Sequence, residues 1–348
     1  MESIVQEKKL SPWKTIILGI QHVFAMFGAT VLVPALTGLD PSVALFTAGV
    51  GTLIFHLLTK GKVPVFLGSS FAFITAISAV VADQGIAYAG GGIIVAGLLY
   101  LVLAGLVLIF GVDRIRSFFP PLVTGPMIMV IGLTLSPSII INNIVGVEGS
   151  EVLAMGTLGQ RWIIVLAVVV TMVVVSIFVK GFFRLVPILL GILVGYIVSI
   201  LFGFVDFTPI RDASIFALPP FTLPKFDIKA ISLIAPIAIV TFMEHIGDIT
   251  TNGAVVGKDF FKDPGLHRTL IGDGVATMFA GLLGGPSNTT YSENTGVLAV
   301  TKVYDPFILR IAAVFAIALG LVGKIGALLK TIPAPVMGGV SILLFGMI

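Results

Sequence analysis

Three carboxylates stand at positions where an apolar chain has little reason to carry charge. Glu244 and Asp248 interrupt the apolar run 230–250, and Glu293 lies in the polar stretch GGPSNTTYSENTG, residues 284–296, between two other apolar runs. A charged side chain at the centre of a bilayer costs at least about 2.5–3.5 kcal/mol on insertion scales. Acids kept at such positions indicate groups that face water, a ligand or one another. Their chemistry is proton uptake and the acceptance of N–H hydrogen bonds.

The spacing of the acids favours proton coupling. Glu244 and Asp248 are four residues apart, so on a helix they share one face. Two carboxyl groups in one desolvated site repel each other when both are charged, which favours the binding of a proton. His245 is the third candidate for proton coupling, although it lies about 100° around the helix from Glu244 and is expected to pack elsewhere. Asp273 is expected to be a solvated residue near the inner end of its helix.

The polar stretch predicts an interrupted membrane crossing, and so does VPVFLGSSFAF at 63–73. Short extended backbone is tolerated within a membrane where protein partners or cavity water satisfy its N–H and C=O groups. Helix is expected to restart near Glu293, and two such starts would direct free N–H groups at the midplane. Phe71 and Tyr291 would add flat apolar faces. These groups fit a small, planar, neutral heterocycle with amide-like N–H and C=O groups better than a simple anion.

The elements that position these groups must be membrane spans. The 348 residues are 57% hydrophobic and 11% charged, with a mean hydropathy of +1.15, whereas soluble domains carry about 25% charged residues. The apolar runs are mostly long enough to cross about 30 Å of hydrocarbon as helix. Twelve spans are expected, at 14–34, 41–59, 64–82, 91–111, 120–139, 161–179, 186–205, 230–250, 268–284, 287–301, 306–323 and 333–348.

The charge distribution predicts a multi-pass protein of the plasma membrane with a cytoplasmic N-terminus. In that orientation 14 of the 20 Lys and Arg residues fall on the cytoplasmic side and 6 on the outside. We therefore assign the net charge of +3 to membrane loops, with the lipid bilayer as partner and no nucleic acid. The chain has no cysteine, which excludes disulfides and thiolate metal sites. No cofactor is expected.

Internal similarity predicts an inverted repeat. QHVFAMFG at 21–28 resembles EHIGDITT at 244–251, and PLVTGPMIMVIG at 121–132 resembles PVMGGVSILLFG at 335–346. These pairs, and the two interrupted spans, are all seven spans apart. Because seven is odd, the second copy would be inverted in the membrane, the arrangement typical of transporters whose site lies at two broken helices.

The repeat sets the expected domain boundaries. A cytoplasmic segment at 1–13 would precede a first repeat of seven spans at 14–205. An extracellular linker at 206–229 would lead to the second repeat at 230–348. That second repeat would hold only spans eight to twelve, so two further spans are expected beyond this chain.

Several motifs resemble the nucleobase–ascorbate transporter family, in particular its bacterial uracil permeases. ENTGVLAVTK at 293–302 fits the family signature of Gln, Glu or Pro, then Asn, any residue, Gly, any four residues, Thr, and Arg, Lys or Gly. Four other segments are similar to uracil permeases, namely QHVFAMFGATVLVP (21–34), KGKVPVFLGSSFAFI (60–74), DPGLHR (263–268) and PVMGGVSILLFG (335–346).

The resemblance implies an all-α polytopic membrane protein of fourteen spans in two inverted halves. It implies a core at about 14–111 and 230–323 and a gate at about 120–205 and 333–348. Spans three and ten would hold short antiparallel β-strands that meet at the substrate. The implied function is import of uracil by proton symport through alternating access. Na⁺ coupling and a homodimer remain open.

The resemblance also implies roles for individual residues. Glu244 and Glu293 would bind the N–H and C=O edge of uracil, and Phe71 and Ser292 would contribute backbone N–H groups. The remaining pocket residues would be Ala29, Ser70 and Tyr291. The chain departs from the family at three positions: Asp248 replaces a histidine tied to proton coupling, Ser292 replaces a glycine, and Phe345 replaces a tyrosine on the gate side.

Three other functions are weighed against uracil transport. A purine permease for xanthine or urate would share the family. An anion exchanger or channel of the same architecture would place basic residues at the helix starts, and 68–74 and 286–296 contain none. An intramembrane enzyme would need a catalytic or metal motif such as H-E-x-x-H, which does not occur. The protein is therefore not expected to be an enzyme.

Overall fold

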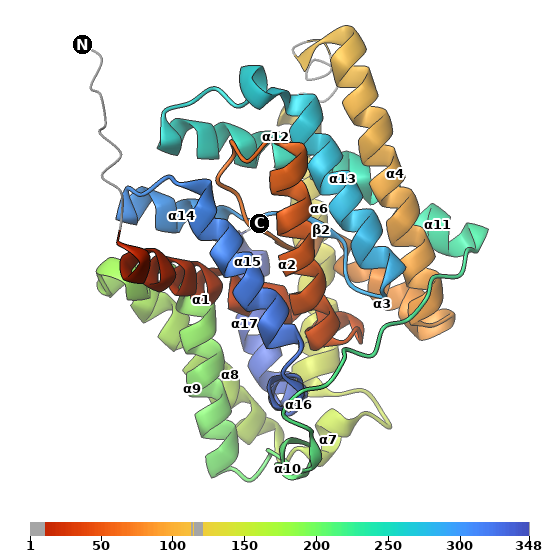
Figure 1. The fold of residues 1–348 in the computed structure, drawn as a ribbon. Coiled ribbons are helices and arrows are strands. Elements are labelled where there is room, and N and C mark those ends of the chain that lie inside the picture. Colours follow the sequence, from red (N-terminus) through yellow and green to blue (C-terminus); the bar gives the residue numbers. More distant parts are fainter. Residues whose placement is uncertain (1–10, 113, 115–120, 348) are drawn as a thin grey trace.

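The computed structural model describes residues 11–112, 114 and 121–347 and is mostly helical (Figure 1). Most of the predicted cytoplasmic segment 1–13 therefore lies outside the described residues. The main helices are α1 (Pro12–Thr37), α2 (Pro41–Leu58), α3 (Ile74–Asp83), α4 (Ile86–Phe110), α6 (Pro121–Ile140), α8 (Leu158–Phe178), α9 (Pro187–Leu201), α11 (Ile228–Ile234), α12 (Ile237–Val256), α13 (Leu266–Leu282), α14 (Ser292–Thr301), α15 (Pro306–Gly320), α16 (Gly323–Lys330) and α17 (Ala334–Met347). The short elements are β1 (Leu67–Ser69), η1 (Phe71–Phe73), η2 (Ile141–Val145), α7 (Glu151–Ala154), η3 (Gly181–Leu185), α10 (Thr208–Asp212), η4 (Phe261–Gly265) and β2 (Asn288–Thr290).

Helix boundaries follow from capping residues in the sequence. Asp40 precedes Pro41 and accepts hydrogen bonds from the first backbone N–H groups of α2, at 2.8 Å for the shortest. Asp305 and Pro306 begin α15 in the same way. The carboxylate satisfies N–H groups that have no partner within the helix, and proline suits the first helical position. α1 ends at Thr37 and is followed by Gly38, whose φ of 76° is the left-handed conformation that glycine adopts without strain.

Each of the twelve predicted spans coincides with at least one helix, but several of these helices are shorter than the predicted span. Among the described residues, five helical segments are long and apolar enough to cross a membrane by length and composition: α1, α2, α4, α8 and the α11–α12 segment. A sixth results if α16 and α17, which are bent by 81°, count as one span. The helices of the third and tenth spans, α3 and α14, have only 10 residues each, because extended backbone takes up the rest.

The two strands occur where the sequence predicts interrupted spans. β1 and β2 pair antiparallel, with Gly68 opposite Thr289 at the centre. Beyond the strands, the N–H of Ser70 donates to the carbonyl of Ser287 at 2.9 Å. This pairing joins segments about 220 residues apart in the sequence. It places the starts of α3 and α14 at opposite ends of one small sheet.

The helices pack in two groups. α13 packs against α4 and α2, and α15 packs against α2 and α1. α8 packs against α9 and α17, and these three helices lie together at the lower left of Figure 1. The boundaries of a core and a gate domain, and the inverted repeat itself, stay predictions.

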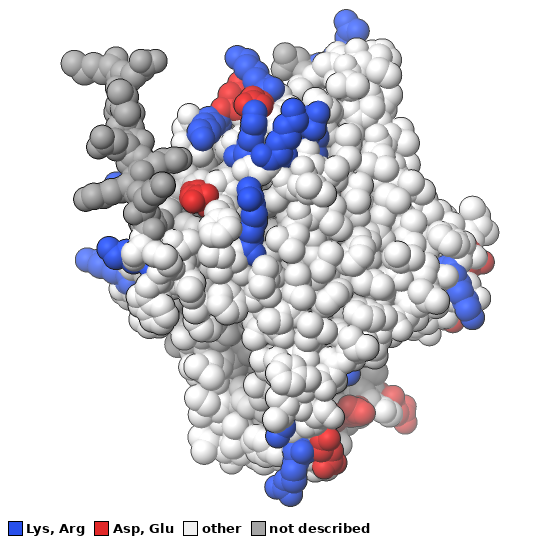
Figure 2. Space-filling model, in the orientation of Figure 1, with Lys and Arg blue, Asp and Glu red and all other residues white. Residues whose placement is uncertain are grey.

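The outward surface of the helices is apolar. Exposed large hydrophobic residues lie on α4, α8 and α9, for example Leu108, Ile177 and Leu201. Figure 2 shows most charged side chains in the upper part and at the right and bottom edges of this view, with a broad uncharged surface between them. Such a surface suits lipid, because in water it would be an unusually large exposed apolar patch.

Candidate functional site

Buried polar atoms gather around the place where β1 and β2 pair, which we call the strand crossing, or simply the crossing. Five of them have no hydrogen-bond partner within the described part of the chain: Oγ of Ser70 and Ser287, Oγ1 of Thr289, and Oδ1 of Asn288 and Asn294. Buried polar groups are nearly always hydrogen-bonded in folded proteins. Water or a polar ligand at the crossing would supply the partners of these atoms. The unpaired atoms therefore mark this region as a candidate binding site.

The three candidate acids lie close to this crossing. Glu244 and Asp248 project from α12, and Glu293 lies in the first turn of α14. Glu244 is close enough to interact electrostatically with both of the other carboxyl groups, and Asp248 interacts with Glu293. Asp248 is tied to the sheet, because the hydroxyl of Thr290 donates to its Oδ2 at 2.9 Å. The fold thus gathers acids that are about 50 residues apart in the sequence.

Tyr291 braces the crossing from one strand to the other. Its hydroxyl donates to the carbonyl of Ser69 at 2.9 Å and is 3.4 Å from the hydroxyl of Thr30. A Cβ atom added at Gly68 would overlap the Tyr291 ring. The ring therefore packs on the middle of β1, and only glycine at position 68 leaves room for it. The family resemblance implies that Tyr291 lines a pocket, and these contacts fix the position of its ring.

Phe71 lies at a junction between helices. It is the first residue of η1 and packs against a cluster made of Val33, Ile74, Ile139 and Phe345. Val33 and Ile74 belong to α1 and α3, whereas the other two belong to α6 and α17. The cluster therefore connects the interrupted third span with the predicted gate.

The other predicted site residues differ in burial. Ala29 is fully buried in α1, whereas Ser292, the first residue of α14, is exposed. The N–H of Ser70 is used by the carbonyl of Ser287, which leaves its hydroxyl as the group that can meet a ligand. Ser70 and Ser292 thus lie on the interrupted spans, and Ala29 lies on α1, which packs against β1 and α14.

The expected solvent exposure of Asp273 is wrong. Asp273 is fully buried, and its Oδ2 lies 2.7 Å from Nδ1 of His245. The other ring nitrogen of His245 lies 2.9 Å from the hydroxyl of Thr269. α13 begins at Leu266, so Asp273 lies two turns inside the helix instead of at its end. The expectation that His245 packs away from Glu244 is confirmed.

Two asparagine side chains that hold α14 in place were not among the predicted site residues. Asn294 Nδ2 donates to both Nδ1 and the carbonyl of His22, at 3.1 Å each. Asn252 Nδ2 donates to the hydroxyl of Thr295 at 3.1 Å and to the carbonyl of Pro64 at 3.0 Å. These bonds tie α14 to α1 and α12. Their occurrence within apolar segments could have identified them from the sequence, because a buried amide needs hydrogen-bond partners.

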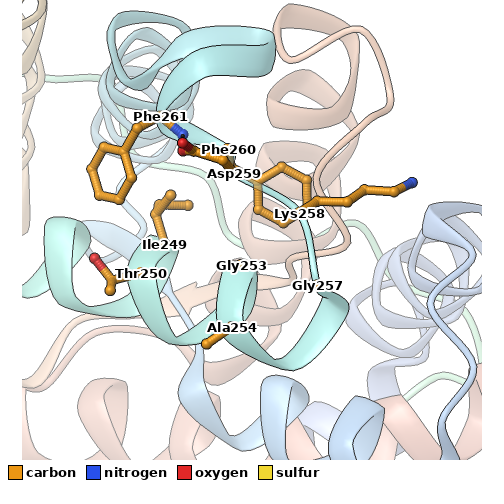
Figure 3. A pocket seen from close by; sticks show the side chains of 9 residues that line it. All are labelled: Ile249, Thr250, Gly253, Ala254, Gly257, Lys258, Asp259, Phe260 and Phe261. Atoms are coloured by element: carbon orange, nitrogen blue, oxygen red, sulfur yellow. Dashed lines mark hydrogen bonds between the residues drawn. The ribbon is translucent and has the colours of Figure 1, made fainter. Parts of the chain in front are cut away.

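The described residues include no group of three or more His, Asp and Glu side chains able to hold a metal ion. A separate hollow of about 330 Å³ lies beyond the crossing, at the end of α12. Figure 3 shows the ring of Phe261 above Ile249, with the Lys258 side chain directed away from both. Neither Glu244 nor Glu293 lines this hollow, so its chemistry is separate from that of the crossing.

Comparison with known proteins adds family relationships. The family model Xan_ur_permease, described as "Permease family", matches residues 13–348. A probable uracil permease of Haemophilus influenzae is 46% identical over 97% of this chain and 80% of its own length. The uracil permease of Bacillus subtilis is 44% identical over 97% of this chain and 79% of its own length. That of Escherichia coli K12 is 42% identical over 96% and 77%, respectively.

Solved structures share the fold at low sequence identity. The transmembrane domain of the cyanobacterial bicarbonate transporter BicA is 18% identical, with a TM-score of 0.73 over 97% of this chain and 89% of that domain. The murine anion transporter Slc26a9 is 13% identical, with a TM-score of 0.70 over 97% of this chain and 60% of that one. At these identities the likeness shows the fold alone.

Proposed function

The chain belongs to the permease family, and from this premise we propose that it imports uracil across the membrane. It is a multi-pass membrane transporter and not an enzyme, as its relatives are permeases. The observation that carries the proposal is the identity of 42–47% to proteins named uracil permease in several bacteria. The polar crossing supports it independently of the relatives.

Uracil suits the groups at the crossing. It is a flat, neutral ring whose edge alternates N–H donors with C=O acceptors. Glu244 and Glu293 are acceptors for ring N–H groups when ionised. The N–H groups at the start of α14, beginning with that of Ser292, are donors for a ring carbonyl. The unpaired hydroxyls of Ser70 and Thr289 supply further polar contacts.

We assign proton uptake to the pair formed by Glu244 and Asp248. Two neighbouring carboxyl groups in a buried site readily share one proton, because their charged forms repel. Asp248 also contacts the end of β2 through Thr290. A protonated carboxyl can donate as well as accept, so protonation changes the bonds available to Thr290. His245 faces Asp273 instead, and we assign it to holding α12 against α13.

Alternating access supplies the transport step of this proposal. The predicted core would move against the predicted gate, and the cluster around Phe71 and Phe345 would lie on the sliding surface. A proton moving inward with uracil would provide the driving force, with Na⁺ as the alternative ion. A homodimer, which the family resemblance leaves open, would hold the gates in place while the cores move.

Uptake of radiolabelled uracil in a permease-null bacterial strain tests the function. Glu244→Gln keeps the size of the side chain but removes the charge, so we expect accumulation to fall to the level of the empty strain. Glu148→Gln is the matched control, because Glu148 is exposed outside the crossing and should retain uptake. A protonophore should abolish accumulation by the wild type. Normal accumulation by Glu244→Gln would refute the assigned role.

Competition distinguishes the other transport functions. Excess unlabelled xanthine should leave uracil uptake unchanged, whereas complete inhibition of uracil uptake would favour a purine permease. The fold neighbours include a bicarbonate transporter, but the helix starts at 68–74 and 286–296 carry no basic residue to attract an anion. Bicarbonate is therefore expected to have no effect on uracil uptake at constant pH.

A further inference from the structure

The outer edge of β1 is held by a hydroxyl group of α2. The N–H of Tyr291 donates to the carbonyl of Phe66 at 3.0 Å across the sheet. Inward-facing and outward-facing residues alternate in an antiparallel pair, so Leu67 directs its N–H away from β2. This N–H donates to Thr52 Oγ1 at 2.9 Å, and the Thr52 hydroxyl donates to the carbonyl of Ala48 at 2.8 Å.

The outer edge of β2 is held in the same way by α13. The carbonyl of Ser287 accepts from Ser70 at 2.9 Å, so by the same alternation Asn288 faces outward. The N–H of Asn288 donates to Thr277 Oγ1 at 3.2 Å, and the Thr277 hydroxyl donates to the carbonyl of Asn288 at 3.0 Å. Thr277 is fully buried. Without it, this N–H would be unpaired in a dry environment, which is costly within a membrane.

The two threonines occupy matching places in the chain. Thr52 lies in GVGTL at 49–53, and Thr277 lies in GVATM at 274–278. Each holds the first residue of its strand. α2 and α13 correspond to the second and ninth predicted spans, the same offset of seven found for the other similar segments. Figure 1 shows both helices beside the crossing.

A glycine three residues before each threonine allows the helix to approach a neighbouring helix closely. A Cβ atom at Gly49 would lie 2.5 Å from the carbonyl oxygen of Ala313 on α15. A Cβ atom at Gly274 would lie 2.9 Å from the carbonyl oxygen of Gly97 on α4. α2 is thus packed tightly against α15, and α13 against α4, on a helix face close to the one that bears the threonine. Each threonine is presented to its strand from a fixed support.

We propose that Thr52 and Thr277 are paired positioning residues for the substrate site. They set the position of the first residue of each strand and thereby the helix starts that follow. Phe71 begins η1 after β1, and Glu293 lies in the first turn of α14 after β2. Neither threonine touches the substrate, and the proposal rests on uracil transport as the proposed function.

An ordinary buried threonine in this protein makes different contacts. Thr37 on α1 is also buried, but its hydroxyl donates to the carbonyl of Val33 on its own helix, at 2.8 Å. Loss of that hydroxyl leaves no strand N–H unpaired. Thr37→Val is therefore the matched control for Thr52→Val and Thr277→Val. Thr52→Ser and Thr277→Ser keep the hydroxyl and test rescue.

The test combines two measurements on the purified full chain in detergent. Equilibrium binding of radiolabelled uracil gives Kd, and hydrogen–deuterium exchange with mass spectrometry reports the backbone at 66–70 and 287–291. We expect each Thr→Val variant to raise Kd about fivefold or more, as for an unpaired buried donor. We also expect faster exchange in the strand that has lost its hydroxyl. The Thr→Ser variants and Thr37→Val should match the wild type in both measurements.

Wild-type Kd and wild-type exchange in Thr52→Val and Thr277→Val would overturn the proposal. Raised Kd that serine does not restore would also overturn it, because the hydroxyl would not be the cause. A valine variant that does not fold is replaced by alanine at the same position, with the same two measurements. If the wild type binds no uracil, the proposed function fails, while the exchange rates still decide whether the threonines hold the strands.

Discussion

Replacing Gly68 with alanine tests whether uracil binding tolerates a displacement of the Tyr291 ring from β1. An added Cβ would overlap two ring atoms of Tyr291 and lie 2.8 Å from Thr30 Oγ1. Gly68 does not have a positive φ, so alanine can adopt its backbone conformation. The effect of Gly68→Ala is therefore steric. It falls on the strand residue that faces Thr289 at the centre of the sheet.

The size of the effect follows from how firmly the ring is held. Tyr291 is only 3% exposed, and its hydroxyl bonds to the carbonyl of Ser69 at 2.9 Å. Forcing an extra carbon into a packed site costs about 1–3 kcal/mol. If the ring moves away, its hydrogen bond is lost as well, at a further cost of about 1 kcal/mol. A total of roughly 2–4 kcal/mol corresponds to a loss of uracil binding of about 30-fold or more, if the whole cost falls on the substrate-bound state.

Initial rates of uracil uptake and Kd of the purified protein measure this loss. Gly105→Ala is the matched control, because Gly105 lies in α4 with no atom within 4 Å of its added Cβ. That change should leave uptake unaltered, since alanine favours helix over glycine. In a Tyr291→Leu background, Gly68→Ala should cost little further binding, because the smaller side chain frees the space above position 68.

If Gly68→Ala binds uracil and transports it as well as Gly105→Ala does, the close packing of Tyr291 on β1 does not exist in the protein. If Gly68→Ala lowers binding as much in a Tyr291→Leu background as in the wild type, the ring is not the obstacle.

Two further substitutions probe side-chain pairs in different settings. Asp273→Leu leaves Nδ1 of the buried His245 without its partner, so we expect a loss of about 1–3 kcal/mol of stability and a lower melting temperature in detergent; an unchanged melting temperature would contradict the pairing. Lys62→Ala removes a pair with Asp263 whose side chains are 44% and 67% exposed, so the loss should be about 0–1 kcal/mol. Uracil uptake by Lys62→Ala should match the wild type, and a large decrease would show that this surface lysine has another task.

Local sequence features predicted where the membrane spans and their interruptions lie. The polar residues at 284–296 and the small residues around Gly68 break apolar runs, and both places contain a strand in the structure. Glu244, Asp248 and Glu293 could be selected because charge in an apolar run is costly wherever the chain folds. The burial of Asp273 was mispredicted, because its partner His245 lies 28 residues away on another helix.

The sequence by itself determined that this is a membrane protein with two broken crossings and with three acids in or between its apolar runs. Composition and breaks in hydrophobicity are properties of short segments, so they can be read without the fold. Only the tertiary structure decided which groups meet. It paired β1 with β2, packed Tyr291 on Gly68 and presented Thr52 and Thr277 to the strand edges. These contacts join residues that are 11 to 223 positions apart, and the bond from Tyr291 to Ser69 spans 222. Packing in three dimensions selects them, because each buried polar group must find a partner wherever one lies.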